Sequence, residues 1–514
     1  MKRTIRVNSI IGGQGPTQYI NIEGGYNAAQ GVDPDFPAES GDKRASGIIV
    51  PTGYSKFSGA NVDSFVNWLI TNIKDEKVYG YQQNGKVVSY DENLANEALV
   101  GTPTSGAGNG GNYYNNYLYF MTPTNVSRYG PLNGTPTLTN TFWTGLSLAA
   151  LTNTTYPTIR NVVIPNHAGH VHGDNCLYFG DVISGQGVIH KIKTTKTTVE
   201  GDTNNGSAYN ALDLPFGFYP VDIESSGTDL AIVAIQTTSD NLIQGNAHLF
   251  LWNTIDDSFF KAIPLPDPLV TAVVNVNGIL MIFTGDGKDG VRISKYIGGN
   301  SVIPVLEIDE GAPPFAGAVD AKGNKLFWGA YQSYPTTAGV VHALGSKKSN
   351  LPQGWHTPVK CTSAGANPMV TAVKAVEQDS TMTPKVIAAW GDDSGKGIDK
   401  YSSSATLSSV MRIGPFNIGE KFSIDRIRIP LAKSIAANMQ IIPKVYIDDE
   451  STTKTLATVN ATNYNGLRKV IYKGADLQDY IGENNFILEL AWGGTVQLPV
   501  LLPILVDIDI YEDE

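Results

Sequence analysis

The chain has 514 residues, of which 17% are charged, and its formal net charge is −11. Average globular proteins carry about 25% charged residues, so this composition, with its 54 glycines, favours short strands and tight turns over helices. The acidic balance argues against sequence-specific nucleic acid as a direct partner, because phosphate binding needs clustered Lys and Arg.

No stretch of the sequence predicts a membrane span or a secretion signal. The last apolar run, at residues 496–510, is broken by prolines and aspartates and falls short of the roughly 20 apolar residues of a membrane helix. The basic N-terminus is not followed by an apolar core of signal-peptide length. Cys176 and Cys361 each lie in or beside an apolar run, so we expect buried small hydrophobic side chains rather than zinc ligands.

Residues 1–58 are predicted to form an extended arm. Only residues 20–26 suggest a strand, and residues 27–46 are rich in Gly, Pro, Asp and Ala with no periodicity. Such a segment cannot bury enough apolar surface to fold alone. We therefore expect it to pack on the body of its own chain or on a neighbouring subunit.

A repeated phrase dominates residues 59–408. In Phe179–Lys191, Phe283–Tyr296 and Trp390–Tyr401, an apolar strand ends on an aromatic residue, and a Gly/Asp turn and a second strand follow. Units repeating every roughly 40–60 residues are typical of stacked β-units, and four-stranded units around an axis form a β-propeller. The sequence predicts a seven-bladed propeller, with an irregular array of β-sandwiches as the alternative. The strands that mark the seven units lie at residues 65–71, 117–120, 176–179, 229–234, 279–283, 325–328 and 385–390.

Residues 409–514 are predicted to form an antiparallel, jelly-roll-like β-sandwich. Several segments alternate apolar and polar residues, which is typical of strands with one buried face. The predicted strands are residues 422–429, 440–447, 454–459, 467–472, 485–492 and 501–511.

Histidines and aspartates provide the candidates for metal binding. His167, His170 and His172 lie close in sequence and could share one metal ion if the loop curls; the alternative is a loop with exposed histidines. Aspartates in the predicted hairpin turns match no EF-hand pattern, and we expect them to stabilise turns. These aspartates are Asp181, Asp286, Asp289, Asp392 and Asp393.

No catalytic motif is present, and we expect a non-enzymatic protein without a cofactor. There is no nucleophile elbow, phosphate-binding loop or dinucleotide fingerprint. Glycosidases use pairs of carboxylates, for which Asp222 with Glu224 and Asp309 with Glu310 are the candidates. Aromatic residues near turns, above all Trp143 and Trp355, could instead stack on sugars, although packing between blades is the more common role.

Three phrases resemble virion structural proteins of tailed bacteriophages: Ile22–Asn27, Ser46–Tyr54 and Phe416–Ile429. The resemblance implies a tail or nozzle component, made in the host cytoplasm and located in the virion. Its partners would be other virion proteins and copies of itself, contacted through the arm and the sandwich. Two alternatives stay open: a receptor-binding adhesin that recognises a host surface glycan, and a propeller glycosidase.

Overall fold

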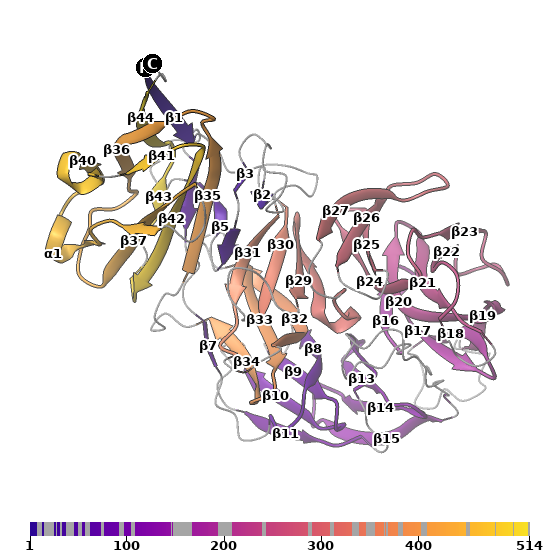
Figure 1. Ribbon diagram of the computed structural model, residues 1–514. Coiled ribbons are helices and arrows are strands. Elements are labelled where there is room, and N and C mark those ends of the chain that lie inside the picture. The colour runs from indigo at the N-terminus through magenta and orange to yellow at the C-terminus, as the bar shows by residue number, and fades with distance from the viewer. Residues whose placement is uncertain are drawn as a thin grey trace.

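β-Strands dominate the part of the chain that the computed structural model describes, so the predicted all-β class is confirmed (Figure 1). In this part α1 (Ala461–Tyr464) is the only α-helix, beside short 3₁₀ turns η2 (Ala316–Ala318) and η3 (Gly474–Leu477), and no helix there is long and apolar enough to cross a membrane. The structure describes residues 1–7, 13–14, 25–26, 28–30, 33–37, 46–49, 54–56, 62–72, 77–91, 97–103, 108–144, 146, 167–193, 208–238, 243–285, 290–308, 313–330, 339–345, 355–363, 365, 368–378, 384–401, 409–448, 453–478, 480–496 and 498–511.

Seven antiparallel sheets of four strands each make up the middle of the described chain. In the first four, consecutive strands pair in sequence order, as expected for strands joined by short hairpins. Their strands are β8 (Val66–Asn72), β9 (Lys77–Gln82), β10 (Val87–Asp91) and β11 (Ala98–Gly101); β12 (Gly110–Tyr114), β13 (Tyr117–Met121), β14 (Asn125–Gly130) and β15 (Thr137–Thr144); β16 (Gly169–His172), β17 (Cys176–Ile183), β18 (Gln186–Ile192) and β19 (Ala208–Phe216); and β20 (Phe218–Ser226), β21 (Asp229–Gln236), β22 (His248–Trp252) and β23 (Lys261–Pro264).

The remaining three sheets follow the same order, except that the last one takes its fourth strand from the N-terminal segment. The second strand of each is almost entirely buried where its side chains are described, because neighbouring sheets cover both of its faces. The strands are β24 (Leu269–Val276), β25 (Ile279–Gly285), β26 (Val291–Tyr296) and β27 (Ile303–Ile308); β28 (Val319–Lys322), β29 (Lys325–Ala330), β30 (Val340–Leu344) and β31 (Trp355–Lys360); and β32 (Met369–Gln378), β33 (Pro384–Gly391), β34 (Lys396–Tyr401) and β7 (Tyr54–Lys56).

The seven sheets form a closed ring (Figure 1). The first strand of each sheet packs on the first strand of the next, in the order β8, β12, β16, β20, β24, β28 and β32, and β32 packs on β8. Radial sheets whose first strands meet around one axis define a β-propeller. The pairing and packing order of the strands is therefore sufficient to assign the propeller fold.

The ring is closed by strands from both ends of the propeller sequence. β7 pairs with β34 in antiparallel register, with Tyr401 opposite Tyr54 and Asp399 opposite Lys56. Lys56 Nζ also lies 4.9 Å from the centroid of the Trp390 ring, a distance at which a cation–π contact is favourable. Closure gives the last sheet four strands like the others and leaves the short strand β7 at its edge.

Two further sheets pack face to face through one hydrophobic core that includes Phe422, Val445, Leu488, Trp492 and Val506. The first sheet contains β1 (Lys2–Val7), β44 (Ile504–Ile510), β36 (Phe422–Pro430), β40 (Lys469–Lys473) and β41 (Ile481–Gly482). The second contains β38 (Thr453–Thr455), β37 (Met439–Ile447), β42 (Asn485–Gly494), β35 (Ser409–Asn417), β4 (Ala28–Gln30) and β39 (Val459–Asn460).

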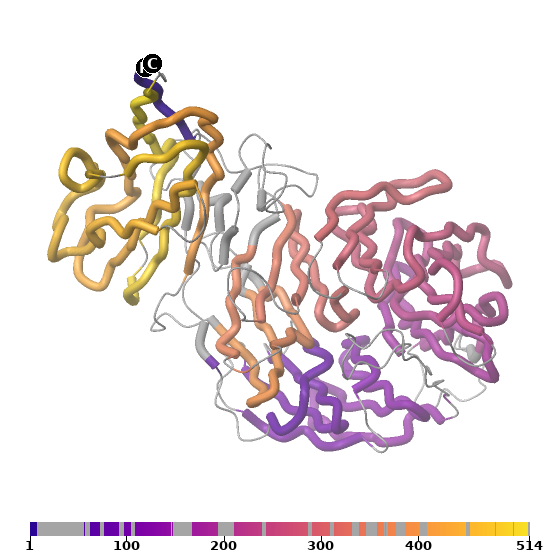
Figure 2. Tube along the Cα trace, in the orientation of Figure 1, coloured from indigo at the N-terminus to yellow at the C-terminus, as the bar shows by residue number. Residues whose placement is uncertain are grey.

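The described strands of the N-terminal segment pair with the body of the same chain. β1 pairs with β44, β4 with β35, and β6 (Ser46–Ile49) with both β5 (Asp33–Pro37) and β43 (Val500–Leu501). A short parallel pair joins β2 (Gly13–Gln14) to β3 (Gly25–Tyr26). β2, β4 and β5 also pack on β31 of the propeller. The segment therefore connects propeller and sandwich, and Figure 2 shows the two chain ends side by side.

Candidate functional site

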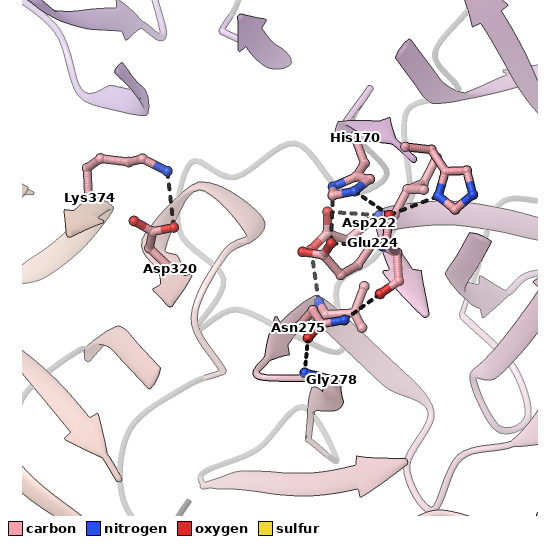
Figure 3. A network of polar contacts seen from close by, with 11 residues as sticks. His170, Asp222, Glu224, Asn275, Gly278, Asp320 and Lys374 are labelled. Atoms are coloured by element: carbon pink, nitrogen blue, oxygen red, sulfur yellow. Dashed lines mark hydrogen bonds and ion pairs between the residues drawn. The ribbon is translucent and has the colours of Figure 1, made fainter. Parts of the chain in front are cut away.

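The first strands of neighbouring sheets carry a set of polar side chains, which we call the inner-strand network (Figure 3). Its His170 and Glu224 side chains keep 24% and 16% of their surface exposed, so the network can be reached from solvent. The labelled side chains are His170 on β16, Asp222 and Glu224 on β20, Asn275 on β24, Asp320 on β28 and Lys374 on β32.

Two aspartates of the network hold the backbone of the next sheet. Asp222 Oδ2 accepts a hydrogen bond from the Val273 backbone N–H at 2.9 Å, and its Oδ1 accepts one from the Ile223 N–H at 2.9 Å. Asp320 repeats this arrangement, since its Oδ2 accepts a hydrogen bond from the Ala375 N–H at 2.8 Å. These bonds tie β20 to β24 and β28 to β32.

The two aspartates differ in their electrostatic surroundings. Burial raises the pKa of Asp222 to about 8, although hydrogen bonds from Val273 and Ile223 oppose the shift. Asp320 has a cationic partner instead, because Lys374 Nζ lies 3.1 Å from its Oδ1. Asp222 is therefore largely a neutral acid near pH 7, whereas Asp320 forms an ion pair.

Two histidines converge on one serine hydroxyl. Ser225 Oγ lies 2.7 Å from His170 Nε2 and 2.9 Å from His172 Nδ1. The other ring nitrogens also have partners: His170 Nδ1 lies 3.1 Å from Glu224 Oε1, and His172 Nε2 lies 3.0 Å from the Thr228 carbonyl oxygen. These contacts link β16 of one sheet to β20 of the next.

This chain of four contacts is one hydrogen short when both imidazoles are neutral. Four hydrogen bonds need four hydrogens, and neutral His170, Ser225 and His172 supply three. Burial lowers the pKa of His170, while the Glu224 carboxylate opposes this shift. A proton on His170 would supply the missing hydrogen, with the Glu224 carboxylate as its counter-charge.

His167 belongs to a separate, fully buried cluster around Asp181. His167 Nδ1 donates to the Gly180 carbonyl oxygen at 2.8 Å, and burial lowers the pKa of His167. His190 Nε2 lies 3.2 Å from Asp181 Oδ2, and the Asn210 backbone N–H donates to His190 Nδ1 at 3.1 Å. His190 therefore donates its Nε2 hydrogen to Asp181, which orders the interior of this sheet.

The three histidines considered as metal ligands are thus divided between two clusters. His170 and His172 meet at Ser225, whereas His167 bonds to Gly180. Within the described residues, no group of three or more His, Cys, Asp or Glu side chains could hold a metal ion. The structure does not bring the three imidazoles to one point.

The tryptophans considered as sugar-binding residues give different outcomes. Trp143, at the end of β15, is only 1% exposed, and its ring packs edge-on against Phe179 with centroids 5.4 Å apart. Because a buried indole cannot stack on a sugar at the surface, this candidate role for Trp143 is wrong for the folded chain. Trp355 lies in β31, but its side chain is outside the described residues.

The carboxylates considered as glycosidase acids are engaged in the fold. Asp222 holds the neighbouring strand, and Glu224 Oε1 accepts a hydrogen bond from the Ser225 N–H at 2.8 Å besides contacting His170. Asp309 and Glu310 lie outside the described residues.

The aspartates predicted to lie in hairpin turns do not share one role. Asp392 does stabilise a turn, since it accepts hydrogen bonds from the N–H groups of Gly365, Ser394 and Gly395. Burial alone would raise the pKa of Asp392, but these hydrogen bonds outweigh it and lower the pKa. Asp181 lies inside β17 and is fully buried, so its prediction as a turn residue is wrong. Asp393 is exposed beside the Asp392 turn, and Asp286 and Asp289 lie outside the described residues.

The sequence motifs described above do not include Ser225, Asn275, Asp320 or Lys374, which the structure places in the network. A signal was present, because Pro268–Val273 and Pro368–Val373 share the pattern Pro-x-Val-Thr-Ala-Val. Both open the first strand of a sheet and both carry a register shift at the same place. Aligning them would have assigned Val274 and Lys374 to equivalent positions on innermost strands.

No protein-family model matches the chain, and no curated protein matches it. Among solved structures, the chain is similar to the WD40 β-propeller domain of Doa1, with 11% identity, 68% of this chain and 98% of that chain covered, and a TM-score of 0.42. The designed Ika8 protein (11% identity, 68% and 98%, TM-score 0.39) and the Neurospora crassa Pan2 WD40 domain (9%, 70% and 96%, TM-score 0.40) are similar too. At these scores the propeller assignment rests on the closed ring of sheets.

Proposed function

We propose that this protein is a non-enzymatic structural component of a tailed-bacteriophage virion, in the tail or nozzle. There it assembles with other virion proteins and with copies of itself. The phrases around Gly25–Tyr26 and Ser46–Ile49 that resemble such proteins belong to strands that join the two domains.

The observation that carries the proposal is that strands of one N-terminal segment pair with both domains. β1, β4 and β6 fill positions in or beside the sandwich sheets, and β7 completes the last propeller sheet. β31 of the propeller packs on β2, β4 and β5. A connection made of paired strands resists relative motion better than a flexible linker, which suits a part that transmits load within a particle.

The test is the composition of purified virions of the phage that encodes the chain. We expect mass spectrometry to detect the protein in stoichiometric amounts, and we expect deletion of its gene to yield incomplete particles. Complete, infectious particles without the protein would contradict the proposal.

One set of distances favours a second candidate function, a serine hydrolase. Ser225 Oγ lies within hydrogen-bond reach of two imidazoles, and Glu224 contacts the far nitrogen of His170. A serine with a histidine base oriented by a carboxylate is the arrangement of a nucleophilic triad. Ser225 Oγ would attack an ester carbonyl, and His170 Nε2 would take the hydroxyl proton and return it to the departing alcohol. Water would then release the acyl group.

A fluorophosphonate probe distinguishes the two functions. A hydrolase is expected to label at Ser225, with labelling lost in Ser225→Ala. If the wild-type chain does not label at neutral pH, Ser225 serves only to connect the sheets, as the non-enzymatic proposal requires.

A further inference from the structure

The outward side of the sheet β1–β44–β36–β40 is a basic surface on an acidic chain, and we call it the outer sandwich face. Alternate residues of these strands, such as Ile427, Val470 and Val506, fill the core, so their neighbours point outward. The outward residues with charged side chains are Lys2, Arg6, Arg426, Arg428, Lys469, Lys473, Asp507 and Asp509, together with Asp425 at a β-bulge.

The acidic residues of this face neutralise only part of its positive charge. Asp507 Oδ1 and Oδ2 lie 2.6 and 2.8 Å from Arg428 Nη2, and Asp509 Oδ2 lies 3.7 Å from Lys2 Nζ. Strand register places Arg426 opposite Asp507, but among the described residues no acidic side chain forms an ion pair with Arg6, Arg426, Lys469 or Lys473. Six basic residues against three acidic ones stand out on a chain whose net charge is −11.

Apolar side chains lie among these charges. Strand register places Ile471 beside Arg428, Arg428 beside Leu505, and Leu505 beside Arg6. Ile471 is 37% exposed. Arginine next to exposed apolar side chains is a composition enriched in protein–protein interfaces, and it differs from a uniformly solvated charged surface.

We propose that the outer sandwich face binds an acidic surface of a second copy of this chain. Charge complementarity favours this partner, because the rest of the chain carries even more negative charge than the whole. The N-terminal strands already pair within their own chain, so they leave assembly to a surface such as this one. Contact between two different patches of identical subunits builds rings or filaments. This interface would be one of the contacts by which the protein assembles in the virion, so its biological role rests on the proposed function.

Charge reversal tests the interface directly. We compare wild type with Arg426→Glu/Lys473→Glu and with a control of equal charge change, Lys77→Glu/Lys295→Glu, whose lysines lie in strands β9 and β26 of the propeller. Sedimentation velocity at about 0.05 M and about 0.5 M salt measures self-association, which high salt should weaken by screening. We expect the face variant to weaken association about a hundredfold, because like charges across an interface cost several kcal/mol, and the control to associate like wild type.

A neutral variant, Arg426→Gln/Lys473→Gln, guards against misfolding and is expected to weaken association by a smaller factor. Wild type that stays monomeric at low salt, or association equal in the face variant and wild type, would overturn the proposal. So would double-stranded DNA binding that the face variant loses while wild type does not self-associate.

The interface and the virion role can fail separately. If virions contain the protein but reversal leaves association unchanged, the interface is wrong and the role stands. If reversal abolishes association but virions lack the protein, the interface stands and the role is wrong.

Discussion

The inner-strand network of the propeller and the outer sandwich face use the same kinds of side chain in opposite ways. In the network, Asp222 and Asp320 accept hydrogen bonds from backbone N–H groups of the next sheet. On the sandwich face, Arg426 and Lys473 form no ion pair with an acidic side chain among the described residues. Polar groups of the first kind stabilise the fold because leaving them unpaired when buried is costly. Charges of the second kind remain available to a partner.

The largest expected effect is in the inner-strand network of the propeller. Asp222→Ala leaves the N–H groups of Val273 and Ile223 without their acceptor, and should lower the free energy of unfolding by roughly 2–4 kcal/mol. Urea denaturation measures the loss. The control Asp257→Ala, in an exposed loop, should stay within about 0.5 kcal/mol of wild type, and an equal loss in both variants would contradict the assigned role of Asp222.

The next prediction uses pH on the same residue. The folded pKa of Asp222, about 8, lies above its unfolded value of about 3.9, so the folded state holds this proton more tightly. The contribution of Asp222 to stability is therefore fully present below pH 4 and is lost as pH rises through about 8. Asp222→Asn, which cannot ionise, should show a smaller fall in unfolding free energy between pH 5 and pH 8. Identical pH profiles would rule out a raised pKa.

Two substitutions with smaller expected effects compare the contribution of the Asp320 backbone contact to stability with that of its ion pair. Asp320→Ala removes the acceptor of the Ala375 N–H and should cost roughly 1–2 kcal/mol. Lys374→Ala removes only a partly exposed ion pair, worth less than about 1 kcal/mol. Denaturant unfolding of both variants and of the double variant measures the coupling. If Lys374→Ala proves the more damaging, the ion pair dominates.

The smallest effect is expected on the outer sandwich face. Arg426→Ala and Lys473→Ala should each change the unfolding free energy by less than about 0.5 kcal/mol, because the fold does not use these charges. Arg428→Ala, which breaks the two contacts to Asp507, is the matched comparison and should cost more. Equal losses at Arg426 and Arg428 would show that the unpaired charges do support the fold.

Local patterns predicted strands and one turn well. An Asn-Gly pair between two strands favours a hairpin turn, and Asn84–Gly85 forms one, with Gly85 at φ 84° and the Lys86 N–H donating to Asn84 Oδ1. The phrases around Asp181 and Asp392 look alike, yet β17 continues past Asp181 to a turn at Ser184–Gly185, whereas β33 ends before Asp392. Where a strand ends depends on its pairing partners, which a short phrase does not specify.

The candidate site was harder to anticipate, because its residues come from different sheets. His170 and Ser225 are 55 positions apart, and Asp320 and Ala375 are equally distant. Of these residues, the sequence pointed only to Asp222 and Glu224, as glycosidase acids, and to the histidines, as metal ligands. In the structure these side chains instead connect neighbouring sheets. Their contacts depend on how innermost strands line up across sheets.

The sequence by itself determined the all-β class, the repeated hairpins and the different apolar–polar pattern of the C-terminal strands. The reason is that turn residues and the alternation of apolar and polar side chains act over a few positions. Tertiary structure alone decided which edges the N-terminal strands fill, since an extended segment rich in Gly and Pro can pair equally well with its own body or a neighbour. Tertiary structure also decided which charges are buried and which stay unpaired. That difference arises from sheet register between distant segments, where a shift of one residue exchanges the inner and outer faces.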